Sequence, residues 1–178
     1  MRGTRKAAIA LAVATAAFAG GCAGSPASAT LADSKGLVQL VRNEAGQRLP
    51  TDDVQEVKLV DDGSEACDDN PAGRERRWSS TLLVTLLPTA SDSLEGTYSD
   101  LIDSFVGNGW SEVTYGGGGA ATLKKPGTDA SIAFTATKAD PDAATPPAIN
   151  ITIRSACVTT AGAESDEVQE LEALAAED

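Results

Sequence analysis

Residues 79–87 read Ser-Ser-Thr-Leu-Leu-Val-Thr-Leu-Leu, and the rest of the fold is arranged around this stretch. Its apolar side chains would lie on both sides of an extended strand: Leu82, Val84 and Leu86 on one side, Leu83 and Leu87 on the other. Two largely apolar faces are typical of a central strand that is covered on both sides or nearly so. We therefore expect a central strand here, and we expect Pro88 to end it.

The clearest helix is predicted between residues 91 and 107, directly after this strand. Its apolar side chains recur at helical spacing and form one continuous stripe: Leu94, Tyr98, Leu101, Ile102, Phe105 and Val106. The glycines of Gly107-Asn108-Gly109 suit a left-handed C-terminal stop. The stripe needs a sheet to cover, and the strand before the helix is its natural partner.

Helical and period-two patterns predict the remaining elements. A short amphipathic helix is expected from about residue 34 to 47, then a strand over 55–61 and an acidic loop over 61–73. Four short strands are expected after the long helix: 112–115, 120–124, 131–138 and 149–155. The resulting order, α-β-β-α-β-β-β-β, predicts an α+β fold. We expect a two-layer sandwich, in which one or two helices pack on one face of a mainly antiparallel sheet.

The predicted domain covers residues 36–160, and an acidic segment follows it. Val168, Leu171 and Leu174 have helical spacing within this segment. A helix this short is unstable alone in water. We therefore expect residues 161–178 to form a solvated, disordered acidic tail.

The chain carries 14 Lys and Arg residues against 26 Asp and Glu residues, a formal net charge of −12. Three of the basic residues and none of the acidic ones lie in residues 1–21, so residues 22–178 carry 11 − 26 = −15. A surface this acidic argues against nucleic acid as a partner, because its phosphates need a basic surface.

Few residues of this sequence point to catalysis. Histidine is absent, which excludes Ser-His-Asp and Cys-His nucleophile systems and imidazole-based zinc sites. Neither a Gly-x-Ser-x-Gly motif nor a phosphate-loop motif occurs, and no cofactor site is indicated. An acidic cluster could in principle hold calcium or supply paired catalytic carboxylates: Asp61, Asp62, Glu65, Asp68, Asp69 and Asn70. Its spacing matches neither kind of site, and a solvated loop is the favoured interpretation.

Two tryptophans and a basic cluster remain to be interpreted. Trp78 and Trp110 each lie next to a turn, where we expect them to cover an edge of the core rather than form a ligand platform. The basic cluster consists of Arg74, Arg76 and Arg77. Pairing with the nearby Asp68 and Asp69 is the favoured interpretation, and an anionic partner such as a lipid headgroup is the alternative.

The first residues have the pattern of an export signal. A basic head of Arg2, Arg5 and Lys6 precedes an apolar run over residues 7–18, and Ala19-Gly20-Gly21 leads to Cys22. The apolar run is too short to span a bilayer, which takes about 20 residues. These features predict a secretory signal peptide over residues 1–21.

A cysteine directly after small residues resembles the lipobox of bacterial lipoproteins, in which Ala19 stands where that family usually has Leu. The resemblance implies cleavage before Cys22, a diacylglycerated Cys22 thiol and, often, an acylated N-terminus. Residues 22–35 would then be the lipidated cysteine and a flexible tether, holding the domain on the extracellular face of the cell membrane. The alternative is ordinary secretion, with cleavage after Ala27 or Ala29.

With Cys22 assigned to the lipid, Cys67 and Cys157 remain. In an oxidising compartment we expect these two residues to form a disulfide. The alternative is a pair of free thiols or metal ligands, which the absence of histidine disfavours.

The leader, the small-residue tether, the two later cysteines and the strand–helix–strands core together resemble small actinobacterial surface lipoproteins of unknown function. The leader, the absence of a nucleophile or metal constellation and the expected disulfide favour a membrane-anchored, non-enzymatic binding or accessory module, whose ligand could be a protein or a lipid. Two alternatives stay open. A lipid or glycolipid carrier would need an apolar cavity, and a carboxylate-dependent cell-envelope hydrolase would need converging acids.

Overall fold

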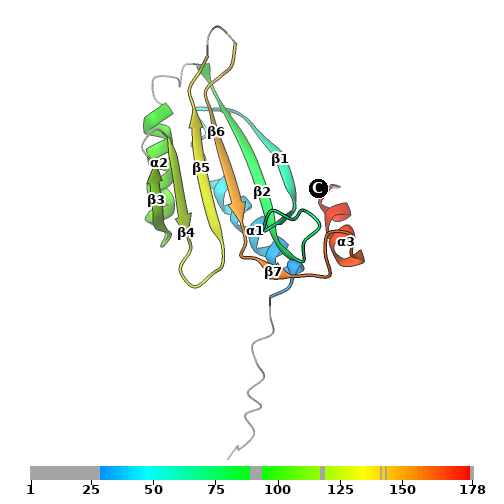
Figure 1. The fold of residues 1–178 in the computed structure, drawn as a ribbon. Coiled ribbons are helices and arrows are strands. Elements are labelled where there is room, and N and C mark those ends of the chain that lie inside the picture. Colours follow the sequence, from blue (N-terminus) through cyan, green and yellow to red (C-terminus); the bar gives the residue numbers. More distant parts are fainter. Residues whose placement is uncertain (1–28, 89–93, 117–118, 141, 143, 177–178) are drawn as a thin grey trace, which may run out of the picture.

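The fold comes from a computed structural model that describes residues 29–88, 94–116, 119–140, 142 and 144–176 of the 178-residue chain. The predicted signal peptide and Cys22 lie outside the described residues. The described elements follow the order α1-β1-β2-α2-β3-β4-β5-β6-β7-α3 (Figure 1). The predicted order of the first eight elements is thereby confirmed, whereas β7 and α3 were not predicted.

The bounds of these elements are as follows. The helices are α1 (Leu31–Gln47), α2 (Leu94–Val106) and α3 (Asp166–Ala175). The strands are β1 (Val54–Ala66), β2 (Glu75–Leu86), β3 (Ser111–Gly116), β4 (Ala120–Lys124), β5 (Ser131–Thr137), β6 (Ala148–Arg154) and β7 (Val158–Thr159).

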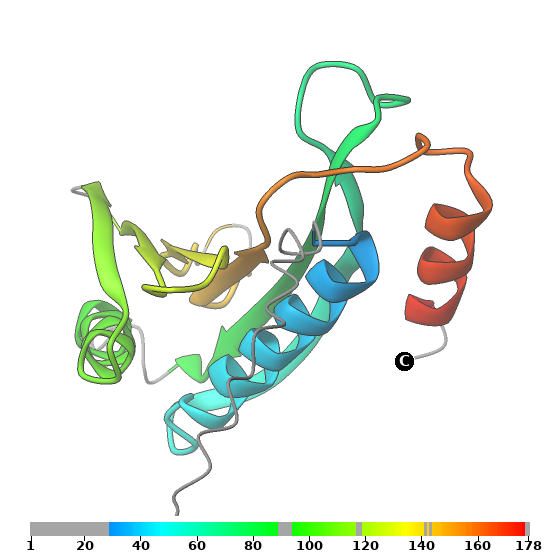
Figure 2. The same cartoon turned by 90° about the horizontal axis from the view of Figure 1, so that it is seen from below.

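The strands form one antiparallel sheet in the order β1-β2-β6-β5-β4-β3, and β7 pairs with the start of β2. Helix α1 packs against β2 and β6, and α2 packs against β5. Both helices cover the same side of the sheet (Figure 2), which we call the inner face. The opposite side is called the open face. The predicted α+β two-layer sandwich is confirmed.

Strand β2 lies between β1 and β6, and alternate residues on it have different surroundings. Leu82, Val84 and Leu86 point to the inner face and are buried. Leu83 and Thr85 point to the open face and are only half-buried, because none of the described helices covers that face. The expectation that this strand is covered on both sides is therefore wrong for the open face.

The hydrophobic core fills the space between the inner face and the helices. Phe105 of α2 is its aromatic centre, with its ring centroid 5.5 Å from that of Trp110 and 5.4 Å from that of Phe134. The fully buried aliphatic residues of the sheet complete this layer: Val84, Leu86, Leu123, Ile132, Ile149, Ile151 and Ile153. The predicted helix stripe, apart from the exposed Val106, and the buried strand faces thus meet in one core.

Helix α1 begins at Leu31, before the predicted start at about residue 34. The reason is a capping box at Thr30: its hydroxyl accepts a hydrogen bond from the Asp33 amide, and the Asp33 carboxylate accepts one from the Thr30 amide. Leu31 is fully buried. Residues 31–35 therefore belong to the folded domain and not to the tether predicted over 22–35.

The C-terminal helix α3 corrects the prediction of a disordered tail over residues 161–178. Val168 is fully buried, and Leu171 packs against the core. The Lys35 ammonium of α1 donates a hydrogen bond of 2.9 Å to the Leu171 carbonyl. A short helix that is unstable in water becomes stable here because β1 and the core give its apolar side chains a surface to cover.

Candidate functional site

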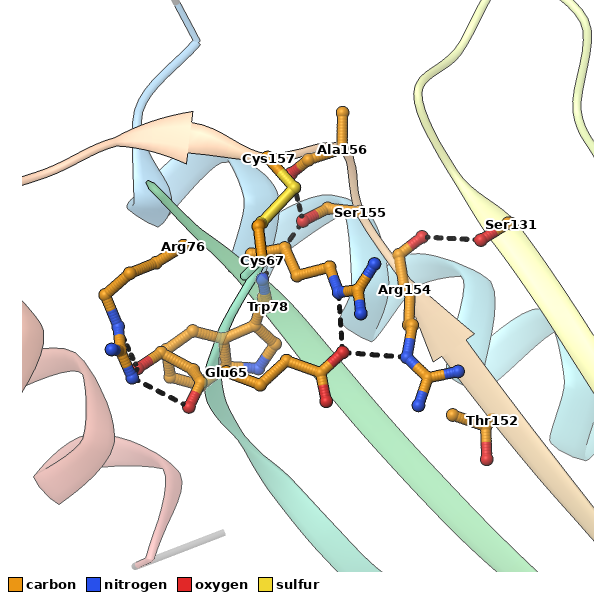
Figure 3. Close-up of polar contacts among 12 residues, drawn as sticks. Glu65, Cys67, Arg76, Trp78, Ser131, Thr152, Arg154, Ser155, Ala156 and Cys157 are labelled. Carbon is orange, nitrogen blue, oxygen red and sulfur yellow. Dashed lines mark hydrogen bonds and ion pairs between the residues drawn. A yellow bond between two sulfur atoms is a disulfide. The ribbon is translucent and has the colours of Figure 1, made fainter. Parts of the chain in front are cut away.

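Cys67 and Cys157 form a disulfide, which confirms the predicted pairing. Their Cα atoms are 6.2 Å apart, and 90 positions separate them in the sequence. The bond joins the loop after β1 to the segment between β6 and β7 (Figure 3). It lies at the end of the domain where β7 pairs with Glu75 and Arg76, the first residues of β2.

Next to the disulfide, three charged side chains from three adjacent strands meet on the open face (Figure 3). Glu65 of β1 lies opposite Arg77 of β2, and Arg154 of β6 lies opposite Ser79, two residues further along β2. The Nε atoms of Arg77 and Arg154 both donate to the same oxygen, Glu65 Oε1, at 2.6 and 2.7 Å. We call Glu65, Arg77 and Arg154 the arginine fork.

The arginine fork leaves most of its hydrogen-bond donors free. Each guanidinium carries five N–H groups, of which Arg77 and Arg154 each use only the one on Nε. Among the described residues, the Nη atoms of both side chains have no protein acceptor. The Arg77 and Arg154 side chains are 32% and 38% exposed, so these donors reach solvent.

The two arginines also set the protonation of Glu65. Burial by itself raises the pKa of its carboxyl group, but the hydrogen bonds and positive charges of Arg154 and Arg77 outweigh burial. The net result is a Glu65 pKa below its ordinary value. The carboxylate is therefore ionised at neutral pH, and the fork carries two positive charges and one negative charge.

We expect the stabilising effect of Glu65 to disappear in acid. Because the Glu65 pKa is lower in the folded than in the unfolded chain, its contribution is complete above the unfolded pKa of about 4.5. It is lost as the pH falls through the lower, folded pKa. The difference in unfolding free energy between the wild type and Glu65→Gln should therefore be constant from about pH 5 to 7 and shrink at lower pH.

Urea unfolding followed by tryptophan fluorescence at a series of pH values measures this difference. Glu112→Gln is the matched control, because Glu112 is exposed on β3 and belongs to no ion pair among the described residues. The unfolding free energy of Glu112→Gln should change with pH in the same way as that of the wild type. A Glu65→Gln difference that grows on acidification would contradict the expectation.

The predicted pairing of the basic cluster with Asp68 and Asp69 is wrong. Arg76 is buried and donates to the Ser64 hydroxyl, the Ser64 carbonyl and the Pro71 carbonyl. The Ser64 hydroxyl in turn donates to Glu172 of α3, so a neutral group links Arg76 to the C-terminal helix. Arg74 donates to the Thr160 carbonyl at 3.0 Å, and Arg77 belongs to the arginine fork.

The acidic cluster is dispersed in the structure rather than gathered in a loop. Strand β1 continues to Ala66, so most of these acids lie on a strand that was predicted to end at residue 61. Asp62 is almost completely buried and accepts hydrogen bonds from Trp78 Nε1 at 2.7 Å and from Arg42 at 2.8 Å. Asp68 accepts from the Asn70 amide. In the described residues, no three His, Cys, Asp or Glu side chains are placed to hold a metal ion.

Both tryptophans are buried in the core. The sequence analysis had placed them at its edge. Trp78 is completely buried, and its ring lies 5.0 Å from the Lys35 ammonium. Trp110 is also buried, with its ring centroid 5.7 Å from the Lys125 ammonium. Neither ring offers a face on which a ligand could stack.

The hollows of the described surface include the following two. One, of about 110 Å³, is lined by Arg48, Pro50, Asp53, Thr97, Asp100 and Leu101. The other is an open groove of about 480 Å³ between α1 and β1, where Val57 and Leu59 are 44% and 42% exposed. Leu82 lies at the base of this groove, and Arg42, Asn43 and Gln47 of α1 form a polar wall.

No family model, curated protein or solved structure significantly matches this chain. None of the helices in the described ranges is long and apolar enough to cross a membrane. Nothing in the described residues indicates an enzyme.

The disulfide was predictable from the cysteine count, but the arginine fork was not, because Arg154 is 89 positions from Glu65 and nothing in the local pattern relates them.

Proposed function

We propose that the chain is an exported lipoprotein, anchored through acyl chains on Cys22 at the extracellular face of the cell membrane. Its domain would act there as a non-enzymatic binding or accessory module. The leader and Cys22 motivate the anchor. The observation that supports export is the Cys67–Cys157 disulfide, since such bonds persist in oxidising compartments and are rare in the cytosol.

The start of α1 supports a defined orientation for such an anchored domain. Between Cys22 and Leu31 the chain can span at most about 32 Å, even if fully extended. Strand β2 alone, with 12 residues, is about 40 Å long. An acylated Cys22 would therefore keep the end of the domain where α1 begins closest to the membrane.

Expression of the full chain in a lipoprotein-processing bacterial host tests the anchor. We expect the wild type in the membrane fraction, with an acylated N-terminal Cys22 in its mass spectrum. Cys22→Ala should move the protein to the medium or leave the leader uncut. Ser25→Ala, a change of similar size in the same segment, should leave the acylated protein in the membrane. Wild-type protein found in the medium without acyl groups would contradict the proposal.

A lipid carrier is the second candidate, and the groove between α1 and β1 is the observation that favours it. Val57, Leu59 and Leu82 give it an apolar floor. Native mass spectrometry of protein released from membranes in mild detergent separates the two functions. A retained lipid mass that Leu59→Asp abolishes and Leu40→Asp leaves in place would support the carrier, because Leu40 is exposed outside the groove.

A further inference from the structure

We propose that Arg77 and Arg154 of the arginine fork bind one phosphate group, which their free Nη atoms hold on the open face. The site itself stands on the geometry of the fork. The expectation that a membrane lipid can supply the phosphate rests in addition on the proposed anchor.

The charges of the fork favour an anion. Two guanidinium groups share one carboxylate, so the fork keeps one uncompensated positive charge. This charge stands out in a segment, residues 22–178, whose net charge is −15. Glu44 also pairs with two cations, Arg48 and Lys125, but through different oxygens, whereas Arg77 and Arg154 share a single oxygen of Glu65. A second anion at the fork would neutralise the positive charge that Glu65 leaves uncompensated.

The free donors suit the shape of phosphate. Arg77 and Arg154 approach Glu65 through Nε alone, at 2.6 and 2.7 Å, which leaves both Nη groups of each side chain available. An arginine offers such groups as a planar fork that can donate two hydrogen bonds to one oxyanion. A carboxylate presents only two oxygens, whereas phosphate presents a tetrahedral set that two forks from neighbouring strands can share.

The surroundings of the fork leave room for a ligand. Gly63 of β1 lies opposite Ser79 of β2 and beside Glu65 on the open face. A Cβ atom placed on Gly63 would meet no atom within 4 Å. Thr152 lies next to Arg154 in the same view (Figure 3), on the same face, where its hydroxyl is hydrogen-bonded to that of Thr81 at 3.1 Å. None of the described helices covers the open face of the sheet here, because α1 packs on the inner face.

The fork lies at the end of the domain that an acylated Cys22 would keep near the membrane. Arg154 is the last residue of β6, and Arg77 is the third residue of β2. Trp78, the next residue of β2, lies under Lys35 in the first turns of α1, on the inner face. In Figure 1, α1 begins near the end of the sheet where β6 ends and β7 follows, and the fork lies on the opposite face of this end. A lipid headgroup and free phosphate are therefore two sources of the same ligand chemistry.

Titration with inorganic phosphate tests the site independently of the anchor. The full chain in non-ionic detergent is titrated at constant ionic strength, while NMR follows the Nε–Hε signals of its arginines. We expect the Arg77 and Arg154 signals to shift together and to saturate. Arg77→Gln and Arg154→Gln should each weaken phosphate binding at least about tenfold. The matched control Arg74→Gln, with the same change of charge nearby, should change the dissociation constant less than about twofold.

Two further variants separate a specific fork from general charge. Arg77→Lys keeps the charge but not the planar fork, and should still weaken phosphate binding several-fold. Glu65→Gln removes the competing carboxylate and should strengthen it. Thermal unfolding of each variant shows that it is folded. The absence of a saturating shift, or an equal loss in Arg74→Gln, would overturn the proposal.

Vesicles distinguish the two sources of phosphate. Acylated protein is inserted into vesicles of phosphatidylglycerol or of a neutral, phosphate-free glycolipid. A lipid source predicts slower amide hydrogen exchange at residues 75–79 and 152–156 in phosphatidylglycerol only, with the effect lost in Arg154→Gln. Equal exchange in both vesicles, together with saturable binding of inorganic phosphate, assigns the site to free phosphate. Failure of acylation at Cys22 would end the anchor proposal without affecting the titration.

Discussion

Replacing Trp78 by alanine is expected to lower the free energy of unfolding by about 3–5 kcal/mol, as for other large-to-small changes of buried aromatic residues. The side chain is fully buried, so its removal leaves a cavity between β2 and α1. The change also removes the hydrogen bond of 2.7 Å that the indole N–H donates to Asp62. The almost completely buried Asp62 carboxylate then has Arg42 as its remaining partner. Urea unfolding followed by far-ultraviolet circular dichroism measures the change.

The contribution of the Trp78 indole N–H can be separated from that of its volume. Trp78→Phe should cost about 1–3 kcal/mol in addition to a small packing loss, because Asp62 loses a hydrogen bond while it stays buried. Trp110→Phe is the matched control, since the Trp110 Nε1 atom is buried without an acceptor among the described residues. The Trp110 change should therefore cost less. Equal costs for the two changes would show that the Asp62 hydrogen bond contributes little.

The second large effect is expected from the disulfide. It closes a loop across 90 positions, for which the loss of chain entropy in the unfolded state corresponds to about 4–5 kcal/mol. The double variant Cys67→Ser/Cys157→Ser should lose up to that amount, and less if the reduced, unfolded chain keeps residual structure. Guanidinium unfolding of the wild type and the variant measures the difference.

Chemical reduction provides the control for this prediction. Wild-type protein in a reducing buffer should unfold at the same denaturant concentration as the double variant, because both lack the same covalent link. The variant itself should not respond to the reducing buffer. A loss below about 1 kcal/mol would mean that the bond between the β1–β2 loop and the β6–β7 segment constrains the unfolded chain very little.

The functional proposals place different demands on the two faces of the sheet. The inner face is occupied by α1 and α2 and forms the core, so it contributes stability. The open face carries the arginine fork at the end near the start of α1, where partners can reach it. Binding by such a domain would depend on a few charged side chains held by adjacent strands, and not on a deep cavity.

Local patterns in the sequence were enough to predict most of the architecture. The stripe predicted from Leu94 to Val106 became the buried face of α2 as far as Phe105, whereas Val106 is exposed, and the alternation around Ile151 became the buried face of β6. These predictions succeeded because side-chain direction in a helix or strand repeats over a few residues. The disulfide was also predictable, because only Cys67 and Cys157 remained once Cys22 was assigned to a lipid.

Only the tertiary structure decided which distant side chains meet. Helix α3 is stable because it packs against β1 and buries Val168 in the core, a contact that the acidic composition of the tail did not suggest. The arginine fork exists because β1, β2 and β6 pair in a particular register and bring Glu65 within 2.7 Å of Arg154, 89 positions away. Strands β2 and β6 are far apart in the sequence and no tight turn joins them, so their register follows from packing on the inner face and not from a local pattern.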